Sequence, residues 1–193
     1  VTIVEDLFIG NKLEQGQLRI DDHCTVDLTA IKNPLVIFAS YGDNITPPHQ
    51  ALGWVPAVYK STDVLKKAGQ RIVYLTNPHV GHLGIFVSAS VARFEHRAIL
   101  ESLTEIEALG PGLYEMKINN PTGNPDCERD QYAVRFEPRK VEDLRFDYPR
   151  KEFERVRNVS EFNETIYRTF MSPWVNAIAN PWLALSMQWL HPM

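Results

Sequence analysis

An α/β fold, with parallel strands covered by helices, is predicted by two apolar runs and by the segments that follow them. "LVIFAS" (residues 35–40) and "RIVYLT" (residues 71–76) are bounded by turn residues and partly β-branched, as expected for strands buried on both faces of a sheet. Each run is followed by a polar loop and then by a helical pattern. This repeated order of strand, loop and helix is typical of a parallel sheet with helices on its faces.

The segments before the first predicted strand are short. Apolar residues at roughly helical spacing predict a helix within residues 1–13, and Gly16 marks the turn after it. Two apolar pieces then flank a turn at Asp21 and Asp22. The chain begins with Val1 inside this helical pattern and has no initiator methionine, so we expect it to be a fragment of a longer protein.

Three helices are predicted between the strands and after them. The two prolines of "ITPPHQ" suit the first turn of a helix. A second short helix begins at Ser61 or Thr62 and stops at Gly69. Residues 91–109 form a longer amphipathic pattern.

The character of the sequence changes beyond Tyr114. Residues 117–130 are rich in Asn, Pro, Gly and Asp and predict a surface loop, and "QYAVRFEP" (residues 131–138) predicts an edge strand. Charges of both signs alternate over residues 135–157, which is typical of a solvated surface with exposed ion pairs. We therefore divide the chain into residues 1–118 and residues 119–193, the second being a loop, an edge strand and a helical extension.

The helical extension is predicted to start at Ser160, which can cap a helix. Pro173 and Pro181 should cut it into short helices. Its tryptophans are more simply packing residues than a ligand site.

Composition excludes several classes of protein. A formal net charge of −4, with no basic stripe interleaved with aromatic residues, argues against binding of nucleic acid. Apolar stretches are too short to span a bilayer, and no secretion signal is visible, so we expect a cytoplasmic protein. Two cysteines in unrelated contexts cannot form a disulfide framework.

Asp43 and His82 form the pattern with the clearest chemical meaning. Each follows one of the two predicted strands by a few residues, and catalytic groups of open parallel sheets gather beyond the carboxyl ends of strands. Alone, Asp43 is a turn former and His82 a surface residue of a glycine-flanked loop. Together they can act as a carboxylate that orients a histidine, which then serves a nucleophile as general base. This order of acid, helix, strand and histidine matches the last third of an α/β-hydrolase fold.

The loops "GDNITPP" and "GHLG", with "NKLEQG" and "VDLTAI" before them, resemble the C-terminal part of polyhydroxyalkanoate synthases. They more closely resemble a bacterial family of uncharacterised proteins related to those synthases. The resemblance covers residues 1–118 and continues into "YRTFMSPWV" in the closer family. It implies the C-terminal part of an α/β-hydrolase fold, with Asp43 as the acid of a triad and His82 as its base. It also implies an acyl thioester or ester substrate, such as a hydroxyacyl-CoA.

The nucleophile of such a triad is missing from these 193 residues. No G-x-S-x-G or G-x-C-x-G motif occurs, and neither Cys24 nor Cys127 lies at a sharp strand-to-helix turn. We expect the nucleophile in the upstream part of the same protein.

Other candidate sites are weaker. His79 and His82 have H-x-x-H spacing, but no further ligand lies nearby in the sequence to complete a zinc site. The sequence contains no EF-hand, P-loop or dinucleotide motif, so neither a metal nor another cofactor is expected.

Three functions remain open. The first is an acyltransferase or esterase that is complete only in the full-length protein. The second is a binding or granule-associated protein that uses the scaffold without catalysis. The third is a self-contained hydrolase, which would need a nucleophile of an unrecognised kind.

Overall fold

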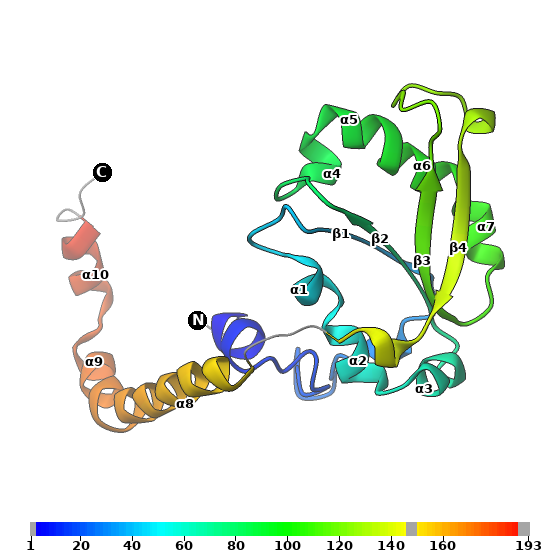
Figure 1. Cartoon of the computed structure of the whole chain (residues 1–193). Helices are drawn as coiled ribbons and strands as arrows, with labels where there is room; N and C mark the ends of the chain where they lie inside the picture. Colours follow the sequence, from blue (N-terminus) through cyan, green and yellow to red (C-terminus); the bar gives the residue numbers. More distant parts are fainter. Residues whose placement is uncertain (1–2, 146–149, 189–193) are drawn as a thin grey trace. The chain divides into compact units, whose positions relative to one another are not determined.

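The computed structural model describes residues 3–145 and 150–188 (Figure 1). The chain divides into two compact units. One consists of residues 11–148, and the other of residues 1–10 together with residues 149–193. The two units are described separately below.

A four-stranded sheet forms the centre of the larger unit. Its strands are β1 (Leu35–Ser40), β2 (Arg71–Asn77), β3 (Gly112–Asn119) and β4 (Ala133–Arg139), and they lie side by side in chain order. β1, β2 and β3 are parallel, and β4 is antiparallel to β3. The structure thus confirms a mixed α/β architecture with a mostly parallel sheet, and it places the predicted edge strand at the β4 position.

β1 is less buried than its apolar sequence predicts. Its first four residues are only partly buried, whereas Ala39 and Ser40 at its end are buried. Among the described strands β1 pairs with β2 alone, so the other edge of β1 has no neighbouring strand. The prediction of a strand buried on both faces was wrong for residues 35–38.

β3 was absent from the sequence-based prediction. Its polar residues Glu115 and Lys117 interrupt the apolar pattern, but they form ion pairs within the sheet. The carboxylate of Glu115 also accepts a hydrogen bond of 2.9 Å from Nε of Arg139 on β4. A buried carboxylate is tolerated when it is paired in this way.

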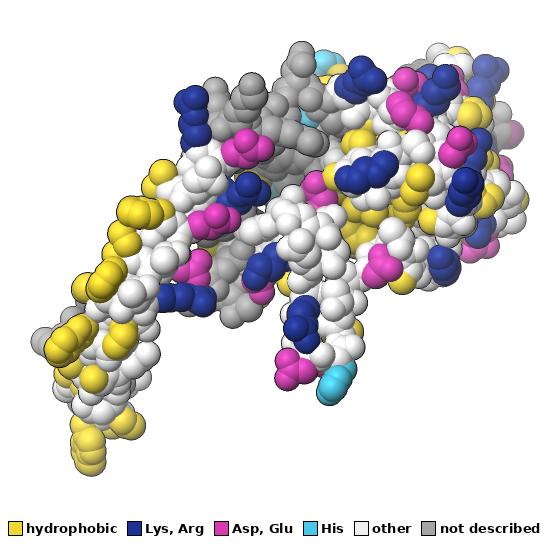
Figure 2. All heavy atoms as spheres, turned by 90° about the horizontal axis from the view of Figure 1, so that it is seen from below, with side chains coloured by type: hydrophobic (Ala, Val, Ile, Leu, Met, Phe, Trp, Pro, Cys, Tyr) yellow, Lys and Arg dark blue, Asp and Glu magenta, His cyan; other side chains and the backbone are white. Residues whose placement is uncertain are grey.

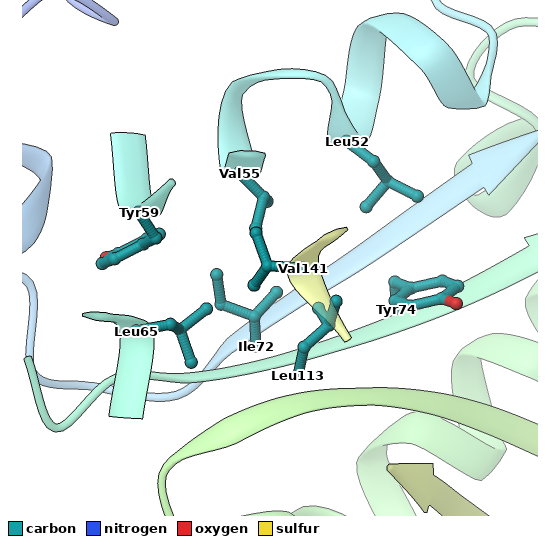
Figure 3. Close-up of a cluster of buried hydrophobic side chains, with 8 residues drawn as sticks. All are labelled: Leu52, Val55, Tyr59, Leu65, Ile72, Tyr74, Leu113 and Val141. Atoms are coloured by element: carbon teal, nitrogen blue, oxygen red, sulfur yellow. The ribbon is translucent and has the colours of Figure 1, made fainter. Parts of the chain in front are cut away.

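One face of the sheet is covered by the helices α1 (Pro48–Leu52), α2 (Trp54–Tyr59) and α3 (Thr62–Lys67) (Figure 1). Ser61 caps α3 by accepting a hydrogen bond from Val64 N, and Gly69 follows it with φ +74°, as predicted. Side chains of these helices meet β2, β3 and the short 3-10 helix η5 (Val141–Asp143) in a core cluster (Figure 3). Its buried members are Leu52, Val55, Tyr59, Leu65, Ile72, Tyr74, Leu113 and Val141.

The opposite core cluster joins the sheet to the helical segment that follows β2. This segment consists of α4 (Gly84–Val87), α5 (Ala89–Val91), η3 (Ala92–His96), α6 (Arg97–Glu101) and α7 (Leu103–Ala108). The predicted single helix over residues 91–109 is therefore broken: it widens to a π-helix in η3 and leaves helical geometry at Ser102. The buried residues of this cluster are Val73, Leu75, Ala98, Ile99, Ile106, Met116, Cys127 and Tyr132.

Three short segments precede β1. A π-helical segment, η1 (Val4–Ile9), takes the place of the helix predicted within residues 1–13. The turn at Asp21 is confirmed, because its carboxylate accepts hydrogen bonds from the backbone N–H groups of His23 and Cys24. On the two sides of this turn, Arg19 and Thr25 form an isolated antiparallel bridge. A 3-10 turn, η2 (Leu28–Ala30), capped by Asp27, leads into β1.

The larger unit extends beyond the predicted boundary at residue 118. A 3-10 turn, η4 (Arg129–Gln131), leads into β4, and β4 pairs with β3 along its whole length. Val141 of η5 is fully buried in the core. The segment from η4 to η5 is therefore integrated with the sheet, while the division into domains at residue 118 stays a prediction.

The smaller unit contains the helical extension. α8 (Arg150–Ile166) starts ten residues before the predicted cap Ser160, so Ser160 lies inside the helix and does not cap it. The helix continues through η6 (Tyr167–Met171) into α9 (Ser172–Ile178), and α10 (Pro181–Gln188) follows. The helix breaks at residues 179–180, directly before Pro181, as predicted. The predicted break at Pro173 was wrong, because this residue lies in the first turn of α9 and the chain is helical on both sides of it. Trp189 lies outside the described residues.

Candidate functional site

Two loops meet at the carboxyl ends of β1 and β2. The strands are parallel neighbours, and their last residues, Ser40 and Asn77, are register partners. Asp43 lies three residues beyond β1 and His82 five residues beyond β2. The sheet therefore brings the two loops to the same edge, as the sequence predicted from the order of the elements.

Asp43 is held in place by its own loop. Its Oδ1 accepts hydrogen bonds from the backbone N–H groups of Ile45 (2.8 Å) and Thr46 (2.9 Å), and its Oδ2 accepts one from the Thr46 hydroxyl (2.7 Å). Burial alone would raise the pKa of Asp43, but the hydrogen bonds from Thr46, Ile45 and His82 outweigh it and hold the pKa well below its usual range. The side chain is thus an ionised, oriented carboxylate.

His82 faces this carboxylate. Its Nδ1 lies 3.0 Å from Oδ2 of Asp43 and 3.3 Å from Oδ1, the range in which an Nδ1–H donates to a carboxylate. The Thr46 hydroxyl lies 3.3 Å from the same nitrogen. The His82 side chain is 36% exposed, whereas that of Asp43 is 8% exposed. The geometry leaves Nε2 of the ring as the nitrogen that can serve another group.

The side-chain hydroxyl of Ser40 contacts the backbone of both loops. Ser40 is buried, its Oγ accepts a hydrogen bond from Gly42 N (3.1 Å), and its hydroxyl lies 3.0 Å from the carbonyl oxygen of Asn77. The carbonyl oxygen of Val80 is also within hydrogen-bond distance, at 2.5 Å. One buried hydroxyl therefore bridges the acid loop and the histidine loop.

Gly42 allows the two loops to approach each other closely. A Cβ at this position would lie 2.4 Å from the carbonyl oxygen of His79, which no real side chain tolerates. The histidine loop is also tied down by Asn77, whose Oδ1 accepts hydrogen bonds from the backbone of His79 (2.9 Å) and Val80 (3.1 Å). The amide of Asn77 in turn donates to Glu95 of η3 (3.0 Å).

Thr46 and Ser40 were not singled out from the sequence. Thr46 has a local signal, because an aspartate side chain in a turn commonly accepts hydrogen bonds from the backbone of the residues that follow it, and Thr46 lies three positions after Asp43. Ser40 has none, because its partners Asn77 and Val80 lie 37 and 40 positions away in the chain. Only the pairing of β1 with β2 brings them together.

Other candidate residues lie elsewhere or alone. Cys24 is exposed in the turn after Asp22, and Cys127 is buried in the core cluster beside α6 and α7. Within residues 3–145 and 150–188, no three His, Cys, Asp or Glu side chains are grouped so that they could hold a metal ion. In the same residues, no helix combines the length and apolar character needed to cross a membrane.

A hollow that is open to solvent adjoins His82. Its volume is about 360 Å³. It is lined by residues 79–82, Gly84, Val87 and Ser88, all from the histidine loop and the start of the helical segment after it.

Comparison with known proteins gives the family of the chain. The model of a family described as "Protein of unknown function (DUF3141)" matches residues 1–193. The chain belongs to this family. A curated relative from Rhizobium meliloti is named "Uncharacterized protein in ackA 5'region". The two sequences are 41% identical over an alignment of 201 residues, gaps included, that covers 99% of this chain. The chain spans 27% of the length of that relative. No solved structure matches the chain.

Proposed function

We propose that this member of the DUF3141 family carries the acid and the general base of an acyl-transfer centre. Asp43 orients the imidazole of His82 through Nδ1, and Nε2 accepts the proton of a Cys or Ser nucleophile from another part of the full-length protein. The observation that carries the proposal is the 3.0 Å distance between Nδ1 of His82 and Oδ2 of Asp43. The two groups meet at the carboxyl ends of adjacent parallel strands, where such a pair can reach a substrate.

Acylation of the nucleophile proceeds through two proton transfers. Nε2 of His82 takes the proton of the nucleophile as its Sγ or Oγ bonds to the carbonyl carbon of the substrate. When the bond from that carbon to the leaving group breaks, Nε2 returns the proton to the leaving thiol or alcohol. An acceptor hydroxyl or water then releases the acyl group by the same steps in reverse. Asp43 remains ionised throughout and stabilises the imidazolium ion, as its low pKa permits.

The substrate class rests on the resemblance of the acid and histidine loops to those of polyhydroxyalkanoate synthases. It favours an acyl thioester, such as a hydroxyacyl-CoA, or an ester, handled in the cytoplasm. Under this proposal the four-stranded sheet is the C-terminal part of an α/β-hydrolase fold, and further strands continue the sheet beyond β1. The much greater length of the Rhizobium relative leaves room for those strands and for the nucleophile.

The test is covalent labelling of the full-length protein with thiol-directed and serine-directed acyl probes. We expect His82→Ala to reduce labelling at least 100-fold, because general-base catalysis contributes about 10²–10⁴-fold. His23→Ala, in the exposed turn around Asp21, is the matched control and should label like the wild type. Undiminished labelling of His82→Ala would refute the role of His82.

A second candidate function is supported by the exposed apolar residues of the helical extension. Figure 2 shows hydrophobic side chains along this extension, and Phe162, Phe170, Trp174 and Trp182 are among the exposed ones. Such a surface is expected of a binding scaffold. If this is the main role, the full-length sequence will lack a glycine-flanked Cys or Ser after a buried strand, and neither probe will label the wild type.

A further inference from the structure

The hydroxyl of Thr46 contacts both members of the Asp43–His82 pair. It donates a hydrogen bond of 2.7 Å to Oδ2 of Asp43, and its oxygen lies 3.3 Å from Nδ1 of His82. Oδ2 is also the carboxylate oxygen nearest to Nδ1, at 3.0 Å. The hydroxyl oxygen, the carboxylate oxygen and the ring nitrogen therefore form a closed triangle, and Thr46 is placed to act on the imidazole as well as on the acid.

A hydroxyl has one hydrogen to donate, and here the carboxylate takes it. The 2.7 Å contact with an ionised acceptor has the length of a charge-assisted bond, whereas the 3.3 Å contact with a ring nitrogen is long. The Thr46 oxygen then faces Nδ1 of His82 with its lone pairs. Because Oδ2 of Asp43 faces the same nitrogen with lone pairs, Nδ1 carries the hydrogen of the neutral ring, and Nε2 is left to accept a proton.

The chain around Thr46 restricts how far its hydroxyl can move. Thr46 precedes Pro47, and a residue before proline is largely confined to extended backbone. Its side chain is β-branched, which limits rotation about χ1. Its backbone N–H donates to Oδ1 of Asp43 at 2.9 Å. The backbone and the hydroxyl of one residue thus each hold one oxygen of the same carboxylate.

We propose that Thr46 is a positioning residue of this site, whose hydroxyl fixes Oδ2 of Asp43 and offers a second acceptor to Nδ1–H of His82. The imidazole is held between two oxygens, in one orientation and one tautomer. The inference rests on the proposed function for its effect on acyl transfer, whereas the shared hydrogen bond exists without any reaction. Thr46 makes and breaks no bond of the substrate and acts through Asp43 and His82.

The first measurement is the NMR resonance of the Nδ1 proton of His82, in full-length protein with ¹⁵N in its histidine rings. Loss of the signal in His82→Gln assigns it. Thr46→Val removes the hydroxyl but keeps the branched shape and the backbone N–H. We expect the resonance to move downfield in this variant, because Nδ1–H then bonds to Oδ2 alone, and Oδ2 has lost the Thr46 donor and accepts more strongly. Thr46→Ser, which keeps a hydroxyl, should restore the wild-type position.

The second measurement is the rate of covalent labelling by the acyl probe as a function of probe concentration. Misplacement of a catalytic group by about 1 Å can cost about 10²-fold in rate, and a partial loss of orientation should cost less. We therefore expect Thr46→Val to lower the maximal labelling rate about tenfold and to leave the half-saturating probe concentration unchanged. Thr46→Ser should label at nearly the wild-type rate.

Thr29→Val is the matched control. The Thr29 hydroxyl donates to Oδ1 of Asp27 at 2.7 Å in η2, which is the same kind of contact in another turn. The groups that lower the pKa of Asp27 are Thr29 and Lys32, where Asp43 has a histidine. Neither Thr29 nor Thr46 is buried, so both variants should fold, which thermal unfolding checks. Thr29→Val should keep the wild-type resonance and labelling rate.

The outcomes separate this inference from the proposed function. An unchanged or upfield-shifted resonance in Thr46→Val would overturn the role of Thr46, as would a failure of Thr46→Ser to restore it or an equal shift in Thr29→Val. Labelling that depends on His82 but not on Thr46 would overturn it too. If the resonance shifts as expected but His82→Ala retains full labelling, the shared hydrogen bond stands and the catalytic role of His82 is refuted.

Discussion

At the scale of single residues, Asp43 shows how two interpretations of one residue can both hold. Its Oδ1 accepts the backbone N–H groups of Ile45 and Thr46, which is the role of a turn former. Its Oδ2 faces Nδ1 of His82, which is the geometry of an orienting acid. The turn therefore holds the carboxylate in the position from which it contacts the histidine, and the hydrogen bonds keep it ionised.

The low pKa of Asp43 predicts how stability depends on pH. Because the pKa in the folded state lies below the value of about 3.9 in the unfolded chain, ionised Asp43 stabilises the fold above that pH. This contribution is lost as the pH falls below 3.9 toward the folded-state pKa. We expect Asp43→Asn to be less stable than the wild type at pH 7, and the difference to shrink below pH 4.

Urea unfolding of both proteins at pH 7, 5 and 3 measures this difference. Asp126→Asn is the control, because Asp126 is an exposed residue whose ion pair with Arg93 spans 3.5 Å at the surface. A stability difference between wild type and Asp43→Asn that is the same at all three pH values would contradict the assignment.

At the scale of elements, the site depends on how the acid loop and the histidine loop pack. Both follow parallel strands, and the buried hydroxyl of Ser40 and the missing side chain of Gly42 keep their backbones in contact. Neither feature touches the carboxylate or the imidazole directly. They set the spacing of the loops and therefore the distance between the two functional groups.

Gly42→Ala tests this packing. The new Cβ would press against the carbonyl oxygen of His79, which is backbone and cannot turn away. We expect the substitution to lower the free energy of unfolding by about 1–3 kcal/mol, the usual cost of overpacking. Gly110→Ala, where only an ordinary contact forms, should change it by less than about 0.5 kcal/mol in a urea titration. Equal effects of the two substitutions would show that the loops are not tightly packed.

Elements were predicted from the sequence where one local pattern dominates. The runs that became β1 and β2 are continuous and apolar, and Ser61 and Gly69 bound α3 as expected. β3 was missed because Glu115 and Lys117 are polar, and Arg139, which pairs with Glu115, lies on another strand. The start of α8 was missed because its first turns are densely charged and were interpreted as a solvated surface with exposed ion pairs.

At the scale of the whole molecule, the two compact units differ in where their apolar residues lie. The larger unit buries its apolar side chains in two clusters, one on each face of the sheet. In the helical extension, Phe162, Phe170 and Trp182 remain exposed. Burial of apolar area is the main source of folding stability, so the larger unit should dominate the stability of the chain.

Two substitutions compare the units. Leu65 is completely buried, and we expect Leu65→Ala to lower the free energy of unfolding by about 2–5 kcal/mol. Phe162 is 64% exposed, and Phe162→Ala should change it by less than about 0.5 kcal/mol. Urea titrations followed by circular dichroism measure both. A loss for Phe162→Ala comparable to that for Leu65→Ala would show that α8 packs against the rest of the chain.

The sequence alone was sufficient for the α/β architecture, for the break before Pro181 and for the expectation that Asp43 and His82 lie at the same edge of the sheet. Each depends on a pattern within one segment, or on the rule that neighbouring parallel strands end at the same edge of the sheet. Three features became visible only in the folded chain. They are the ionised state of Asp43, the close packing of the two loops at Ser40 and Gly42, and the hollow beside His82. The packing at Ser40 and Gly42 and the contact of His82 with Asp43 join atoms that are distant in the chain and that meet only when β1 pairs with β2. The hydrogen bonds of Thr46 and Ile45 to Asp43 and the hollow are local in the chain, but they depend on the backbone conformation that each loop adopts in the fold.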